Sequence, residues 1–124
     1  MKDNNKEIAL KFIEKYTSND PFSKYTLYDK KCISLEIPQD KTERMQTIGL
    51  SKIKAKSKKF YRQFKKINKK KISKPIIGDV GFALTIELSG VDKNGNSLKI
   101  KEICVFIIRN NKIVEENFYY LKSF

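Results

Sequence analysis

The sequence predicts a protein of the α+β class, with helices mostly in its first half and an antiparallel sheet in its second. Apolar residues recur at helical spacing in two early segments, whereas apolar and polar residues alternate over much of residues 81–120. Between two alternating segments stands Asn94-Gly95, a pair that favours the tight turn of a β-hairpin. With 124 residues, 40% of them hydrophobic, the chain is expected to form one domain, residues 1–124, around one core.

Two helices are expected before the first strand. Residues 4–17 place apolar side chains from Ile8 to Tyr16 on one face, which predicts an amphipathic helix. Residues 18–21 interrupt this pattern, and Phe22–Tyr28 can form a short second helix.

A strand, a loop and a third helix should follow. Alternation over Lys31–Pro38 predicts the strand, and the polar residues 39–47 predict the loop. A helix is expected directly after Gly49. Its inner face would consist of Leu50, Ile53, Ser57, Phe60, Tyr61 and Phe64.

The remainder is predicted to be a meander of strands. The expected strands are Lys70–Ile77, Gly81–Ser89, Ser97–Ile108 and Lys112–Tyr120. Asn94-Gly95 should join two of them in a type I′ turn, in which both central residues have positive φ. Asn110-Asn111 offers a second tight turn.

Composition excludes several classes of site. The chain has no histidine, which removes Ser-His-Asp triads, Cys-His dyads and histidine-rich metal sites, so neither a metal nor a cofactor is predicted. Cys32 and Cys104 are predicted to be buried free thiols. Residues 1–6 are polar and the longest apolar run, Ile103–Ile108, is short, so no secretory signal and no membrane span is expected, and the cytoplasm is the default location.

Several short motifs, together with the order of elements, point to a known family. Asp20 ends the first helix, Gly49 precedes the third, and Lys112–Glu116 and Phe118–Tyr120 follow a tight turn. Over nearly the whole chain this pattern resembles the SnoaL-like family of the nuclear transport factor 2-like superfamily. Asn111 stands where that family usually has a turn glycine, and Asn tolerates the same left-handed backbone.

The resemblance implies a cone-shaped, curled antiparallel β-sheet whose concave face meets three helices around a small-molecule pocket, as in cystatin-like folds. Members include polyketide cyclases, ketosteroid isomerases and proteins without catalysis. The resemblance therefore leaves open whether this chain is an enzyme or a non-catalytic binding module. It implies an unknown small apolar ligand and a homodimer formed through the outer sheet face.

The ketosteroid isomerase machinery is missing from this sequence. Aligned by hand on the last hairpin, that enzyme's aspartate base, tyrosine and neutral aspartic acid correspond to Ile37, Phe12 and Cys104. An isoleucine cannot take a proton and a phenylalanine cannot donate to an oxyanion, so that mechanism is not expected.

Glu102 and Glu116 are the candidate catalytic residues. If Cys104 faces the concave side, alternation places Glu102 there, and it places Val114 and Glu116 there on the last strand. Two carboxyl groups in one apolar cavity would raise at least one pKa, as acid–base catalysis requires, unless one pairs with a lysine or lies in water at the rim. Glu36 is a weaker candidate, because it alternates with isoleucines and a leucine. The expected pocket residues are Phe12, Tyr16, Ile37, Phe60, Phe64, Phe82, Cys104, Phe106, Phe118 and Tyr120.

The net charge of +13 is concentrated in residues 52–74, which hold twelve basic and no acidic residues. A solvated lysine-rich helix surface is the favoured interpretation, and an anion-binding surface is the alternative. Only three of the 27 basic residues are arginine, so base-reading of nucleic acid is not predicted. The candidate anion-binding residues are Lys52, Lys56, Lys59 and Lys66, of which Lys56 could instead face the pocket mouth.

Overall fold

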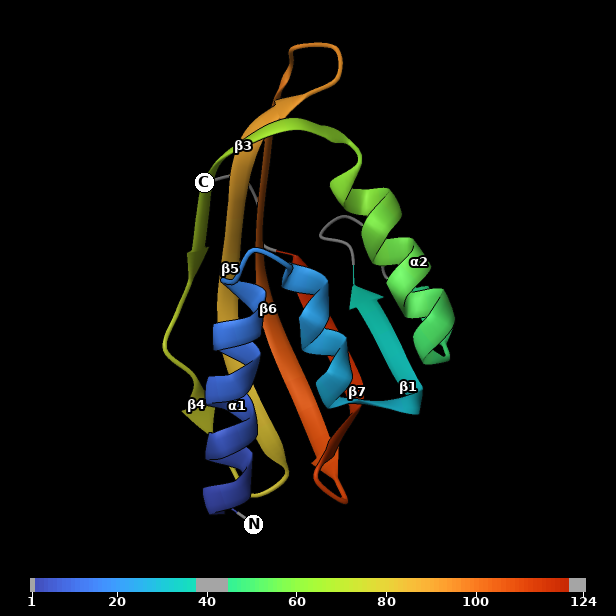
Figure 1. The fold of residues 1–124 in the computed structure, drawn as a ribbon, viewed down its shortest axis with the longest axis vertical. Helices are drawn as coiled ribbons and strands as arrows, with labels where there is room; N and C mark the ends of the chain where they lie inside the picture. Colours follow the sequence, from blue (N-terminus) through green and yellow to red (C-terminus); the bar gives the residue numbers. More distant parts are fainter. Residues whose placement is uncertain (1, 38–44, 121–124) are drawn as a thin grey trace.

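A computed structural model describes residues 2–37 and 45–120 and confirms the α+β class, with a curled, open sheet partly covered by helices (Figure 1). The elements are α1 (Lys2–Tyr16), η1 (Pro21–Leu27), β1 (Tyr28–Ile37), β2 (Met45–Ile48), α2 (Leu50–Tyr61), β3 (Phe64–Ile72), β4 (Ile76–Ile77), β5 (Gly81–Asp92), β6 (Ser97–Arg109) and β7 (Lys112–Tyr120). No helix in the described ranges is long and apolar enough to cross a membrane. The expected strand end at Pro38 and the loop residues 39–44 lie outside the described residues.

The sheet has seven strands in the order β2-β1-β7-β6-β5-β3, and β4 pairs with β5 beside β3. All pairings are antiparallel except that of β1 with β7, which is parallel and joins the two halves of the chain. Helix α1 packs against β4 and β5, α2 packs against β1 and β2, and η1 contacts both helices (Figure 1). Helix α1 therefore covers the β4–β5 end of the sheet, and α2 covers the β1–β2 end on the same face (Figure 1).

The short second helix is a 3-10 helix, and it ends one residue earlier than expected. Asp20 caps its start, where the carboxylate accepts a hydrogen bond from the Phe22 backbone N–H over 3.1 Å, and Pro21 occupies its first turn. Tyr28 is already the first residue of β1.

The third helix is shorter than predicted. Helix α2 ends at Tyr61, and the backbone N–H of Gln63 donates to the Phe60 carbonyl over 3.1 Å in a tightened last turn. Phe64 and Lys66 belong to β3, which is exposed along nearly all of its length. This strand was missed before residue 70 because it lies at the sheet edge and carries lysines on both faces, so it shows no apolar alternation.

The predicted strand Lys70–Ile77 is two strands, β3 and β4, separated at residues 73–75. Pro75 lies in the break, where its lack of a backbone N–H costs no ladder hydrogen bond. The Ser73 hydroxyl instead accepts the backbone N–H of Thr85 over 2.8 Å, which keeps the segment attached to β5.

The two predicted hairpins form, but the turn at Asn94-Gly95 differs from the predicted type. At Asn94-Gly95 only Gly95 has positive φ, at 85°, and the Asp92 carboxylate accepts the N–H groups of Asn94 and Asn96 over 2.9 Å each. The type I′ prediction was therefore wrong there. Asn110 and Asn111 have φ of 52° and 62°, the pair of positive angles that a type I′ turn needs.

The apolar core joins side chains of the three helices to the inner face of the sheet. Phe12 of α1 packs against Phe82 and Phe106, with ring centroids 5.8 and 4.7 Å away. Ile113 is fully buried, whereas Val114, which alternation placed inside, is only partly buried. A register shift between Ile107 and Ile108 in the β6–β7 pairing breaks the simple alternation at this point.

Candidate functional site

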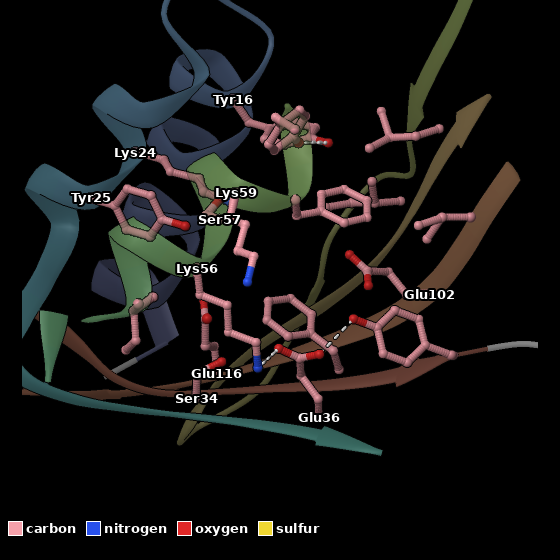
Figure 2. Close-up of a pocket in the computed structure, with 18 of the residues that line it drawn as sticks. Tyr16, Lys24, Tyr25, Ser34, Glu36, Lys56, Ser57, Lys59, Glu102 and Glu116 are labelled. Carbon is pink, nitrogen blue, oxygen red and sulfur yellow. Dashed lines mark hydrogen bonds and ion pairs between the residues drawn. The ribbon is translucent and has the colours of Figure 1, made fainter. Parts of the chain in front are cut away.

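A cavity of about 390 Å³ lies between the concave sheet face, η1 and α2 (Figure 2). This volume falls within the range of small-molecule sites. Its apolar wall includes Ile86, Leu88, Ile100, Phe60 and Phe118. Its polar groups include three glutamates, Glu36, Glu102 and Glu116, which come from three different strands.

Glu36 is bound on both sides. One carboxylate oxygen forms an ion pair with Lys56 of α2, and the other accepts a hydrogen bond from the Tyr120 hydroxyl over 2.9 Å (Figure 2). Burial, together with Glu102 and Glu36, raises the pKa of Tyr120, which therefore stays a neutral donor. This triad ties α2 to two adjacent strands and leaves Glu36 engaged.

Glu116 is the most deeply buried of the three, with 3% of its surface exposed. The Tyr28 hydroxyl donates to its Oε1 over 2.5 Å, and Ser34 also hydrogen-bonds the carboxylate. Burial raises the pKa of Glu116, while Lys24 and the two hydrogen bonds oppose that rise.

Glu102 is the least engaged carboxyl. In the described structure the Cys104 thiol makes a long polar contact with its carboxyl group, 3.8 Å from Sγ to Oε1. Burial raises the pKa of Glu102 to about 7, Lys24 opposes the rise, and Glu116 and Glu36 add to it. Glu102 can therefore hold or release a proton near neutral pH.

Lys24 comes from η1 and is 93% covered, with 7% of its surface exposed. Its ammonium nitrogen lies 5.1 Å from the ring centroids of Tyr16 and Tyr25 and 5.3 Å from that of Phe12. Burial lowers the pKa of Lys24, and the charge of Glu116 is the largest opposing effect. A basic group thus lies in the cavity wall among aromatic rings.

A tyrosine pair forms another part of the wall. The hydroxyls of Tyr16 and Tyr61 lie 3.0 Å apart and share a hydrogen bond. Burial raises the pKa of both, so both stay neutral at physiological pH. Each can offer a hydroxyl to a ligand.

The structure brings together six of the twelve candidate catalytic and pocket residues. The cavity is lined by Glu102, Glu116, Tyr16, Phe60, Phe118 and Tyr120. Phe12, Phe82, Cys104 and Phe106 lie in the adjoining core, and Phe64 packs beneath the end of α2 against Phe60. Ile37 pairs with Tyr119 on the face opposite to Glu36, so it points away from the cavity.

On β1 the polar side chains face the cavity and the aliphatic ones face outward. Ser34 and Glu36 line the cavity, whereas the sequence interpretation took the aliphatic side as concave. The parallel pairing places Ser34 beside Glu116 and Glu36 beside Phe118. This register determines which face of β1 lines the cavity. Lys24 and Tyr25 were also missed, because a short 3-10 helix has no clear apolar period.

The four candidate anion-binding lysines come from two elements, α2 and β3. Lys52 is exposed on α2, Lys56 is paired with Glu36, and Lys59 lines the cavity. Lys66 lies on β3 rather than on the helix. No cluster of metal-binding side chains occurs among the described residues.

The sequence model of the SnoaL-like domain matches residues 4–120. The chain belongs to the SnoaL-like family. A search of curated proteins found no match to this member.

Solved structures share the nuclear transport factor 2-like fold of this SnoaL-like protein. A candidate SnoaL-like polyketide cyclase from Mesorhizobium loti has a TM-score of 0.77 at 23% identity, covering 92% of this chain and 97% of its own. Bal32a, from a soil-derived mobile gene cassette, has a TM-score of 0.77 at 15% identity, with coverages of 98% and 92%. A phenazine biosynthesis-related protein from Pseudomonas aeruginosa has a TM-score of 0.69 at 12% identity, with coverages of 96% and 82%. At these identities the likeness establishes the fold.

Proposed function

We propose that this SnoaL-like protein binds a small, largely apolar molecule in the cavity, and that Glu102 exchanges a proton with it in an isomerase- or cyclase-like reaction. The observation that carries the proposal is the difference between Glu102 and the other two glutamates. Glu36 and Glu116 are held by Lys56, Tyr120 and Tyr28, whereas Glu102 has a single long thiol contact within the described structure.

The cavity suits a ring-sized ligand with few polar groups. Its aliphatic and aromatic wall favours an apolar body, because burial of apolar surface drives binding. Among the polar groups, Glu102 and Tyr120 are neighbours across β6 and β7. A ligand carbon next to a carbonyl group, placed at Glu102, would be the site of proton exchange.

The chemistry follows from the state of Glu102. With a pKa raised to about 7 by burial, both its carboxylate and its acid form are present at neutral pH. The carboxylate takes a proton from the ligand carbon, and the resulting acid returns it to another position. The polyketide cyclase description of the Mesorhizobium loti protein and the biosynthetic description of the Pseudomonas aeruginosa protein support a reaction of this kind.

Hydrogen–deuterium exchange at carbon tests this function. 2-Tetralone and cyclohexanone are incubated with the protein in D₂O at pH 7, and loss of the α-proton signal beyond that in buffer alone is followed by NMR. Glu102→Gln should slow the protein-dependent exchange by about 100-fold or more. Glu87→Gln, on the neighbouring strand and alternating to the other side of the sheet, is the matched control and should exchange as the wild type does.

Two results would point elsewhere. Saturable binding of these ketones without Glu102-dependent exchange would support the alternative, a non-catalytic binding module. If the protein neither binds these ketones nor exchanges their protons, the proposed small-molecule function is ruled out for this ligand class.

A homodimer through the outer sheet face is a second proposal, favoured by apolar side chains there. Ile103 and Tyr119 are neighbours on that face, 37% and 40% exposed, and Ile37 lies beside Tyr119. Exposed apolar residues that adjoin one another are typical of association surfaces. Sedimentation velocity should show a dimer that Ile103→Lys converts to a monomer, while a wild-type monomer at all concentrations would contradict it.

A further inference from the structure

We propose that Lys24 anchors an oxygen atom of the ligand, so that the ligand is an enolisable carbonyl compound whose oxygen lies at Lys24 and whose acidic carbon lies at Glu102. The inference rests on the proposed function and names the substrate class and a second functional residue for the same cavity. Lys24 would touch the substrate directly.

The position of Lys24 is set by η1. Asp20 caps this helix and Pro21 begins it. The Lys24 side chain extends inward from the helix toward Tyr16 and Tyr25 (Figure 2). The ammonium nitrogen lies near the faces of Tyr16, Tyr25 and Phe12, at 5.1–5.3 Å from the centroids. Aromatic faces stabilise a cation at this range.

The N–H donors of this ammonium have no oxygen acceptor among the described residues. Lys24 takes part in none of the ion pairs found there, and none of the hydrogen bonds found there uses it as a donor. No side-chain nitrogen or oxygen that is sealed from solvent lacks a partner among the described residues, so the Lys24 nitrogen is open to the cavity rather than enclosed in the core. Since Lys24 lines the cavity, a ligand oxygen can supply the acceptor.

Negative groups around Lys24 partly offset the effect of burial on its pKa. Glu116, Cys104 and Glu102 all act electrostatically on Lys24. The Glu116 carboxylate already accepts hydrogen bonds from Tyr28 and Ser34. Burial lowers the pKa of Lys24, and negative charge on a ligand oxygen would raise it again. The site therefore favours a ligand that gains negative charge on oxygen.

The step balances in atoms and charge. The Glu102 carboxylate takes the proton as the carbon–hydrogen bond breaks, and the electron pair moves into the carbon–carbon double bond of an enolate. The carbonyl oxygen takes the negative charge and accepts hydrogen bonds from the Lys24 ammonium, in a site partly shielded from water where such a contact is strong. Return of the proton to a conjugated carbon regenerates both residues.

A phenolate is a stable analogue of such an enolate, and 4-nitrophenol reports its own ionisation by absorption. Its spectrum is recorded against pH with saturating protein. We expect the bound probe to ionise at lower pH than the free probe, with the phenolate-to-phenol ratio at a given pH raised by about tenfold or more. Lys24→Met should abolish that gain, Lys24→Arg should retain part of it, and Lys54→Met, an exposed position on α2, should leave it unchanged.

Glu102→Gln should shift the probe in the direction opposite to Lys24→Met. Above pH 7 the Glu102 carboxylate opposes a bound anion, so its removal should increase the phenolate fraction at pH 8. 4-Nitroanisole cannot ionise. Its affinity for the wild type should therefore not rise with pH over the range in which 4-nitrophenol ionises.

The wild-type protein alone can overturn the inference, whether or not Lys24→Met folds. A bound probe with no gain in phenolate, or no saturable binding of either probe, would overturn it, as would an equal gain in folded Lys24→Met. The deuterium-exchange assay is separate: Glu102-dependent exchange without a Lys24-dependent phenolate gain would sustain the proposed function and remove the anchor.

Discussion

The Tyr28 hydroxyl donates a hydrogen bond to Glu116 Oε1 over 2.5 Å, joining the first residue of β1 to the middle of β7. Both side chains are buried, with 4% and 3% of their surfaces exposed. The bond therefore holds a carboxyl group of the cavity wall in place and provides it with a donor that solvent cannot replace.

Tyr28→Phe removes this donor and leaves the Glu116 carboxyl partly unsatisfied. We expect the free energy of unfolding to fall by about 1–3 kcal/mol. The loss should be larger at pH 8 than at pH 5, because the hydrogen bond lowers the pKa of Glu116 against the rise caused by burial. Urea unfolding at both pH values measures it, and Tyr119→Phe, at an exposed position, should change stability by less than about 0.5 kcal/mol.

Glu102→Gln should remove a pH dependence of stability. The Glu102 pKa is raised from 4.5 to about 7, so between these values the folded chain binds more protons than the unfolded chain and stability falls as pH rises. Relative to the wild type, the variant should gain up to about 3 kcal/mol at pH 8 and nothing from this source at pH 4. An equal gain at both pH values in urea titrations would show that Glu102 does not titrate in this window.

The ion pair between Lys56 and Glu36 should contribute more than an exposed pair. Lys56→Met, Glu36→Gln and the double variant form a cycle whose coupling energy we expect to be about 1–2 kcal/mol, because the Glu36 side chain is mostly buried. The same cycle for Lys11 and Glu7, exposed and one turn apart on α1, should give about 0.3–0.5 kcal/mol. Equal coupling in the two cycles would argue against a shielded pair.

Gly81 is required by close packing rather than by a special backbone angle. A Cβ atom there would lie 1.8 Å from the Phe106 carbonyl oxygen, which is backbone and cannot rotate away. Gly81→Ala should therefore destabilise the protein by about 3 kcal/mol or more, as seen in a lowered melting temperature. Ala83→Ser, two residues along the same strand, should cost less than about 1 kcal/mol; a mild effect of Gly81→Ala would mean that β5 and β6 can separate locally.

The elements that the sequence predicted well are those whose signal is local. Helix α1 and strands β5 to β7 follow from spacing within ten or so residues, and Asn110-Asn111 follows from the backbone preference of asparagine. Strand β3 was missed over residues 64–69, because pairing with β5 rather than an apolar face holds it in the sheet. Strand β2 was missed as well, since its four residues are too short to show a period.

The candidate site was predictable where a strand is antiparallel to its sequence neighbour. Glu102 and Glu116 were found because β6 and β7 form a hairpin, so one residue of known orientation orients the rest. Glu36 and Lys24 were not, because their orientation depends on contacts with segments far away in the chain. Polar residues facing a cavity also reverse the usual rule that the apolar side of a strand faces inward.

The parallel pairing of β1 with β7 has a consequence for synthesis on the ribosome. Apart from β2, β7 is the sheet neighbour of β1, and β7 is the last strand in chain order among the described residues. Until that strand has left the exit tunnel, Ser34 and Glu36 lack the β7 residues beside which they lie, and Tyr28 lacks the Glu116 carboxylate. The cavity wall is thus incomplete until β7 is available, and a nascent chain stalled before residue 112 would carry helices and hairpin strands but an unfinished cavity.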